Sequence, residues 1–148
     1  MTEKGLKERK NTFPKAEHLK GDIRIASVMR TGKSFLVYPV KVIYASDNEN
    51  PRRPHDVTSS PSVRLMVSVP KRRLHHAVDR NLIKRRMRES YRIAKHNLSE
   101  HLLQQNKRMF LIFRYVANET LDYSTISKAV SRALHSLVRK VEENQIPS

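Results

Sequence analysis

Arginine and lysine are concentrated in residues 71–95, where their side chains have the chemistry to bind phosphate groups. This stretch holds ten Lys or Arg residues against two acids, Asp79 and Glu89, and contributes half of the formal net charge of +16. Arginine offers planar pairs of N–H donors that match phosphate oxygens, and lysine offers a compact positive charge. A segment this basic is typical of a nucleic-acid-binding surface, a membrane-surface helix or a solvated charged face.

The spacing of these residues gathers the charge on one side of a helix. At about 100° per residue, six of the seven basic positions from Arg80 onward and one amide fall within an arc of about 140°. These positions are Arg80, Asn81, Lys84, Arg85, Arg88, Arg92 and Lys95. The opposite side suits packing and carries Ile83, Met87, Ser90, Ala94 and Leu98. The pattern therefore predicts a folded helix with one cationic face, because a disordered tail has no reason to sort its charges.

Three interpretations of this basic helix place different demands on its other side chains. A solvated face would need more than two acids for balance, and a membrane-surface helix would carry Trp, Phe or Leu on its apolar side. That side instead has Ile83, Met87 and small residues, which suits protein packing. Nucleic acid is therefore the favoured ligand. A strand and Pro70 precede the helix where a helix-turn-helix needs a second short helix, so folded RNA is favoured over DNA.

Other residues with chemical potential lack the spacing that catalysis or ligand binding requires. Gly32-Lys33-Ser34 matches the end of a P-loop, but Ser27 stands where the first glycine belongs. Adjacent His75 and His76 point to different sides of a helix and have no third ligand at a usual spacing. The sequence offers no clear carboxylate pair or Ser/His/Asp arrangement. We therefore expect no metal site and no catalytic residue in this polypeptide.

Composition limits the architecture and the compartment. A length of 148 residues at 38% hydrophobic content predicts one domain with a small core. No apolar run approaches the roughly 20 residues of a membrane span, and the N-terminus lacks an apolar signal core. The chain has no cysteine, which rules out disulfides and thiolate zinc sites. We expect a cytoplasmic protein without membrane association.

Periodicity and turn residues outline the elements that must position the basic helix. Residues 1–14 are interpreted as a flexible basic arm, residues 15–148 as a single RNA-binding domain, and residues 45–62, rich in proline, as a mobile loop. Three helices are expected. The first covers about 22–31, with Asp22 as its cap and Gly32 as its stop, the basic helix covers about 71–103, and the last covers 123–143, with Asp122 as its cap. Strands are expected at 35–44, interrupted at Pro39, and at 63–69 and 109–116, the last being central. This order predicts an α+β or α/β sandwich, a small mixed sheet with helices packed on it, in which the basic helix crosses over between two parallel strands.

Residues 68–92 closely resemble the protein component of bacterial ribonuclease P. They read SVPKRRLHHAVDRNLIKRRMRESYR, and the family pattern is a strand ending Ser-Val-x-Lys-Lys/Arg, then Ala-Val-x-Arg-Asn-Arg-x-x-Lys-Arg-x-x-Arg-Glu. Length, charge and element order agree over about residues 15–142. One departure is Leu82, which replaces the third residue of the Arg-Asn-Arg signature and lies off the basic face of the wheel. A weakened but retained site is the expected result.

The resemblance implies a partner, a substrate and a cofactor. The partner would be the catalytic RNA of ribonuclease P, and the substrate precursor tRNA, whose 5′ leader is removed by hydrolysis of one phosphodiester. The chemistry would belong to the RNA and its Mg²⁺ ions, with no protein oligomer required. Two other interpretations stay open: a ribosome-associated RNA-binding module without a substrate cleft, and an autonomous nuclease.

The resemblance also assigns roles to individual residues. RNA contact is expected at Lys71, Arg72, Arg80, Asn81, Lys84, Arg85, Arg88 and Arg92. The single-stranded leader would lie in a cleft between the first helix and the sheet, lined by Ile25, Met29 and Tyr44, with Tyr38 as the alternative to Tyr44. Family members usually present aromatics from the first helix, so aliphatic Ile25 and Met29 imply softer apolar contact in place of base stacking.

Overall fold

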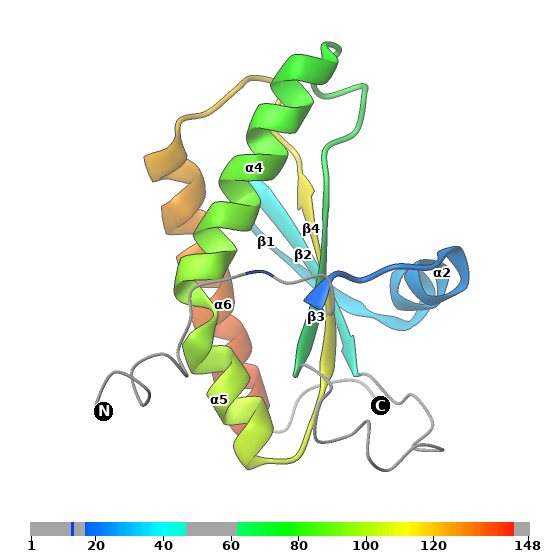
Figure 1. Cartoon of the computed structure of the whole chain (residues 1–148), viewed down its shortest axis with the longest axis vertical. Helices are drawn as coiled ribbons and strands as arrows, with labels where there is room; N and C mark the ends of the chain where they lie inside the picture. The colour runs from blue at the N-terminus through cyan, green and yellow to red at the C-terminus, as the bar shows by residue number, and fades with distance from the viewer. Residues whose placement is uncertain (1–12, 14–16, 47–61, 144–148) are drawn as a thin grey trace, which may run out of the picture.

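A computed structural model describes residue 13, residues 17–46 and residues 62–143 of the chain. Within those residues it contains four helices and four strands (Figure 1). In chain order they are α2 (Asp22–Thr31), β1 (Lys33–Val37), β2 (Val40–Ser46), β3 (Val63–Ser68), α4 (Ala77–Ala94), α5 (His96–Gln104), β4 (Met109–Tyr115) and α6 (Tyr123–Glu142). The predicted arm at residues 1–12 and the predicted mobile loop at residues 47–61 lie outside the described residues.

The strands form one mixed sheet in the order β1-β2-β4-β3. β1, β2 and β4 pair antiparallel, and β3 pairs parallel with β4 in a register that joins Leu65 to Leu111 and Val67 to Phe113. The predicted α+β fold, the parallel pair bridged by the basic helix and the central position of the last strand are therefore confirmed. Burial on both faces explains why residues 109–115 are almost continuously apolar.

Helices cover the two faces of the sheet unequally. α4, α5 and α6 pack on one face and α2 lies on the other (Figure 1). Because side chains alternate along a strand, Val42, Leu65 and Leu111 join the large core under α4 to α6, whereas Ile43 and Ile112 join the small core under α2. α2 itself fully buries only Val28, so it is the most lightly anchored of the four helices.

Several predicted boundaries need correction. The basic helix does not run unbroken to residue 103, because α4 ends at Ala94 and α5 begins at His96. Ala45 and Ser46, assigned to the loop, extend β2. Asp22 is the first helical residue rather than the cap, and Gly21 precedes it with a φ of 94° that favours glycine. In the described residues no helix has the length and apolarity to cross a membrane.

Asp122 caps α6, as the sequence predicts. Its carboxylate oxygen accepts a hydrogen bond from the backbone N–H of Thr125 at 3.0 Å, which satisfies one free donor of the first turn. Hydrogen bonds from the Thr125 side chain and backbone hold the pKa of Asp122 below its ordinary value of 3.8. The ionised carboxylate therefore favours the folded chain.

Replacing Asp122 with alanine is expected to lower the melting temperature at neutral pH. A pKa that is depressed in the folded state means that the stabilisation is present above the unfolded-state pKa and is lost as the pH falls through the folded-state pKa. The difference in melting temperature between wild type and D122A should therefore shrink below about pH 3.9. Thermal unfolding followed by circular dichroism at a series of pH values measures this difference. A difference in melting temperature that stays constant as the pH is lowered would contradict the prediction.

Candidate nucleic-acid interface

The packing side of α4 is the one that its periodicity indicates. Ile83, Met87 and Ser90 are buried under this helix, and Tyr91 is buried beside them. On the same wheel Tyr91 falls about 20° past Arg80, inside the basic arc and about 40° from Met87, so the sequence pattern alone does not identify it as a packing residue. Its ring meets Phe113 edge-on at a centroid distance of 6.1 Å, which fixes α4 to the sheet.

Four predicted contact residues form a continuous outer face on α4. Asn81, Arg85 and Arg88 are exposed, and Lys84 is half-buried with them on the same side. Residues three or four apart on a helix are surface neighbours, so 81, 84, 85 and 88 make one compact group of donors. Leu82 is half-buried. This group can bind several phosphates of one RNA strand or of two adjacent strands. We name these four residues the α4 cationic face.

Arg80 joins the α4 cationic face to the turn before the helix. Its Nη1 donates to the carbonyl oxygens of Leu74 at 2.9 Å and His75 at 2.8 Å. The turn that begins at Lys71 is thereby held against the first turn of α4, with Lys71 and Arg72 exposed. Arg80 thus has a structural role in addition to any contact with RNA.

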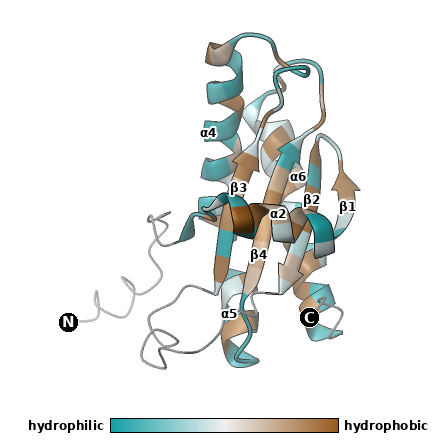
Figure 2. Cartoon of the chain, turned by 90° about the vertical axis from the view of Figure 1, so that its right-hand side faces the viewer, coloured by the Kyte–Doolittle hydropathy of each residue, from teal (hydrophilic) through white to brown (hydrophobic). Residues whose placement is uncertain are grey.

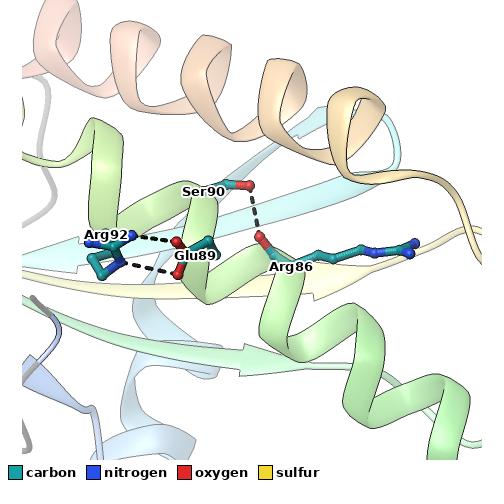
Figure 3. A network of polar contacts seen from close by, with 4 residues as sticks. All are labelled: Arg86, Glu89, Ser90 and Arg92. Atoms are coloured by element: carbon teal, nitrogen blue, oxygen red, sulfur yellow. Dashed lines mark hydrogen bonds and ion pairs between the residues drawn. The ribbon is translucent and has the colours of Figure 1, made fainter. Parts of the chain in front are cut away.

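Arg92 is engaged by an acid on its own helix. Its guanidinium forms an ion pair with Glu89 one turn earlier, and its Nε donates to Glu89 Oε2 at 3.1 Å (Figure 3). The hydrogen bond from Arg92 is the main reason that the pKa of the Glu89 carboxyl lies below its ordinary value. Contact of Arg92 with RNA stays a prediction, and it would require sharing or replacing this pair.

Arg86 serves the fold rather than the cationic face. Figure 3 shows its side chain pointing away from the Glu89–Arg92 pair. Its Nη1 donates to the carbonyl oxygen of Leu121 in the segment between β4 and α6, at 2.5 Å. The hydroxyl of Tyr115 supports the same segment by donating to Glu119 O and accepting from Leu121 N.

Lys95 does not belong to the cationic side on which the wheel places it. The residue is 5% exposed, and its Nζ lies 2.6 Å from Glu17 Oε1. The expectation that Lys95 continues the stripe is wrong because Lys95 follows the last residue of α4 and its side chain binds a carboxylate 78 residues away in sequence.

The predicted cleft residues separate onto two faces of the sheet. Ile25 packs against the small core between α2 and the sheet, and Met29, one turn later, is 41% exposed. Tyr44 is 3% exposed on the opposite face, edge-on to Phe35 and within 5.8 Å of Lys140 Nζ. The assignment of Tyr44 to the cleft is therefore wrong, since its strand register turns it away from α2. Tyr38, the alternative, is 60% exposed beyond the end of β1.

A row of polar residues on the α2 side of the sheet was missed by the sequence interpretation. Register places Lys41 opposite Arg114 and Ser68 beside Arg114, so all three share the face that carries α2. Lys41 is exposed, and Arg114 Nε has no hydrogen-bond partner within the described residues. Figure 2 shows α2 crossing this face, with the C-terminal ends of β3 and β4 extending past it. Polar residues inside otherwise apolar strands are the only sequence signal for this row.

The described residues do not gather donors for a divalent metal. No group of three or more His, Asp or Glu side chains comes together among them. Two carboxylates near α4, those of Glu17 and Glu89, already hold cationic side chains. These residues therefore do not fit a protein-held Mg²⁺ ion.

Comparison with known proteins places this arrangement in one family. The Ribonuclease P family model matches residues 13–138. A ribonuclease P protein component from Porphyromonas gingivalis is 33% identical over 132 residues, covering 89% of this chain and 90% of the relative. One from Chlorobium phaeobacteroides is 37% identical over 89 residues, covering 60% and 57%.

Solved structures agree in fold. The Staphylococcus aureus RNase P protein superposes with a TM-score of 0.59 at 22% identity, over 82% of this chain and 95% of that one. A mutant of that protein superposes with a TM-score of 0.60 at 20% identity, over 92% of this chain and 95% of the mutant's chain. At this identity the likeness supports the fold alone, while the family match and the relatives carry the assignment. The chain belongs to the ribonuclease P protein family.

Proposed function

We propose that this chain binds the catalytic RNA of ribonuclease P through the α4 cationic face and the 5′ leader of precursor tRNA on the α2 side of the sheet. Family membership makes it a protein component of an RNA-associated endoribonuclease of tRNA processing. The observation that carries the finer proposal is the α4 cationic face, exposed on a helix whose other side is locked into the core.

The proposed contribution of the α4 cationic face is electrostatic. Each phosphate that Lys or Arg neutralises releases condensed counterions, so binding gains free energy that falls as salt rises. Two RNA molecules that bind in one complex repel each other electrostatically, and a cationic protein between them lowers the free-energy cost of this repulsion. In this proposal hydrolysis is carried out by the RNA. Mg²⁺, when bound to the RNA, supplies charge stabilisation at the scissile phosphate, and no step is assigned to a metal held by this chain.

The proposed leader surface combines charge with soft apolar contact. Lys41 and Arg114 supply cations on the α2 side of the sheet, and Ser68 beside Arg114 supplies a hydroxyl. Ile25 and Met29 lie four residues apart on α2 and offer aliphatic surface. A leader would be held by its backbone and by non-stacking contact with its bases, which tolerates variation in base sequence.

Reconstitution tests the proposed function. The chain is combined with ribonuclease P RNA and precursor tRNA at low Mg²⁺, and release of the 5′ leader is followed with time. Stimulation over the RNA alone is expected, and it should shrink as Mg²⁺ or salt rises because free cations then replace the protein's charge. Equal rates with and without protein would contradict the proposal, and crosslinking to ribosomal RNA alone would favour the ribosome-associated alternative.

A further inference from the structure

A short N-terminal segment contacts three separate parts of the fold. We name Phe13 and Glu17–Leu19 the N-terminal strap. Phe13 stacks on His18 within the strap at a centroid distance of 4.1 Å. His18 bridges to Leu65 in parallel fashion beside β3, and the backbone N–H of Leu19 donates to Leu65 O at 2.9 Å. The strap therefore lies along the outer edge of β3.

The strap is also attached to the end of α4. Glu17 and Lys95 form an ion pair at 2.6 Å, with side chains 19% and 6% exposed. The ring of Phe13 meets the buried ring of Tyr91 edge-on at 5.5 Å, and Lys95 Nζ lies 6.0 Å from the centre of the Tyr91 ring. Removing one partner of an ion pair this buried is costly, because the remaining charge then has neither its partner nor water around it.

The strap continues directly into α2. Leu19 is buried in the small core with Val28, and Gly21 begins the turn into the helix. Since α2 fully buries only Val28, its own packing gives it little hold on the sheet. Its placement therefore depends on what fixes its two ends, and the strap fixes the first of them.

We propose that the Glu17–Lys95 ion pair and the Phe13–Tyr91 contact position α2 relative to α4, and thereby set the geometry between the leader surface and the α4 cationic face. This inference rests on the proposed function for its consequence in binding, but not for its structural content. Glu17 and Lys95 are positioning residues that act through α2. Phe13 was assigned to the flexible arm, and its packing on Tyr91 corrects that boundary.

The absence of cysteine from the chain permits a direct distance measurement. Cysteines introduced at Ile23 on α2 and Ile93 on α4, which are 88% and 50% exposed, accept spin labels without competing thiols. Pulsed electron–electron double resonance on the free protein should give one narrow distribution of the distance between the two labels. In the Glu17→Gln or Phe13→Ala variant the width of this distribution should increase at least about twofold, because α2 loses one of the contacts that fix its position. Glu143→Gln, the same chemical change at the exposed residue that follows α6, should leave it unchanged.

Binding to the reconstituted holoenzyme supplies the functional readout. The leader-dependent gain is the ratio of the dissociation constants of mature and precursor tRNA. Glu17→Gln should reduce it by about 3- to 10-fold, since small misplacements of a binding group are costly, while affinity for the catalytic RNA changes less than about 2-fold. Unbroadened distances in both strap variants would overturn the inference. A wild-type holoenzyme without leader-dependent gain would defeat the proposed function and leave the distance result to decide the inference.

Discussion

A variant carrying Lys84→Gln, Arg85→Gln and Arg88→Gln is expected to bind the catalytic RNA about 100-fold more weakly near physiological salt, with a salt dependence shallower by about 2 to 3. These three cations lie within about one turn of each other on the side of α4 that faces solvent. None of them supports the core, so glutamine should leave the melting temperature nearly unchanged. The measurement is a series of equilibrium titrations with RNA at several salt concentrations.

The chain offers a matched control for this variant. Lys128, Arg132 and Arg139 are exposed on the outward side of α6, so changing them to glutamine removes the same charge elsewhere. Only a small, long-range loss of affinity is expected there, because these residues lie outside the proposed interface. Equal losses in the two triple variants would show that total charge, and not the α4 cationic face, governs RNA binding.

Gly32→Ala is expected to displace the end of α2 and abolish most of the leader-dependent gain. A Cβ at this position would stand 2.5 Å from Val28 O and 2.9 Å from Tyr44 O, both backbone atoms that cannot move alone. The backbone conformation itself, with φ at −74°, suits alanine, so the effect is purely steric. Crowding of this kind costs about 1–3 kcal/mol, and here relief requires the C-terminal end of α2 to shift relative both to its own last turn and to β2.

Two measurements separate this effect from general unfolding. The leader-dependent gain should fall strongly in Gly32→Ala while catalytic-RNA affinity stays within about twofold, because α4 lies on the other face of the sheet. Ala26→Ser adds one atom on the exposed side of α2 and should behave as wild type. A Gly32→Ala protein with full leader-dependent gain would show that the placement of α2 does not govern leader binding.

Local periodicity predicted most of the elements and the orientation of α4. The 3.6-residue repeat identified Ile83 and Met87 as packing residues, and the cap at Asp122 follows from side-chain chemistry one turn away. Both features depend on residues close in sequence, where spacing alone determines which side chains meet.

The errors concern residues whose neighbours are distant in sequence. Strand alternation shows that Ile43 and Tyr44 face opposite sides, but which side receives α2 depends on packing across the sheet. The row of Lys41, Arg114 and Ser68 arises from register between three strands, which no single strand encodes. The burial of Lys95 likewise depends on Glu17, which stands far away in the chain.

The internal engagement of basic residues has a consequence for the salt sensitivity of the proposed RNA complex. Of the ten cations in residues 71–95, five are bound by the protein's own carbonyls, amide or carboxylates: Arg73, Arg80, Arg86, Arg92 and Lys95. With about five phosphate contacts, doubling the salt concentration would weaken binding about 11- to 23-fold, whereas with ten contacts it would weaken binding about 130- to 500-fold. Because half of these cations stabilise the fold, the proposed RNA complex is expected to tolerate a rise in salt better than a complex that used all ten cations would.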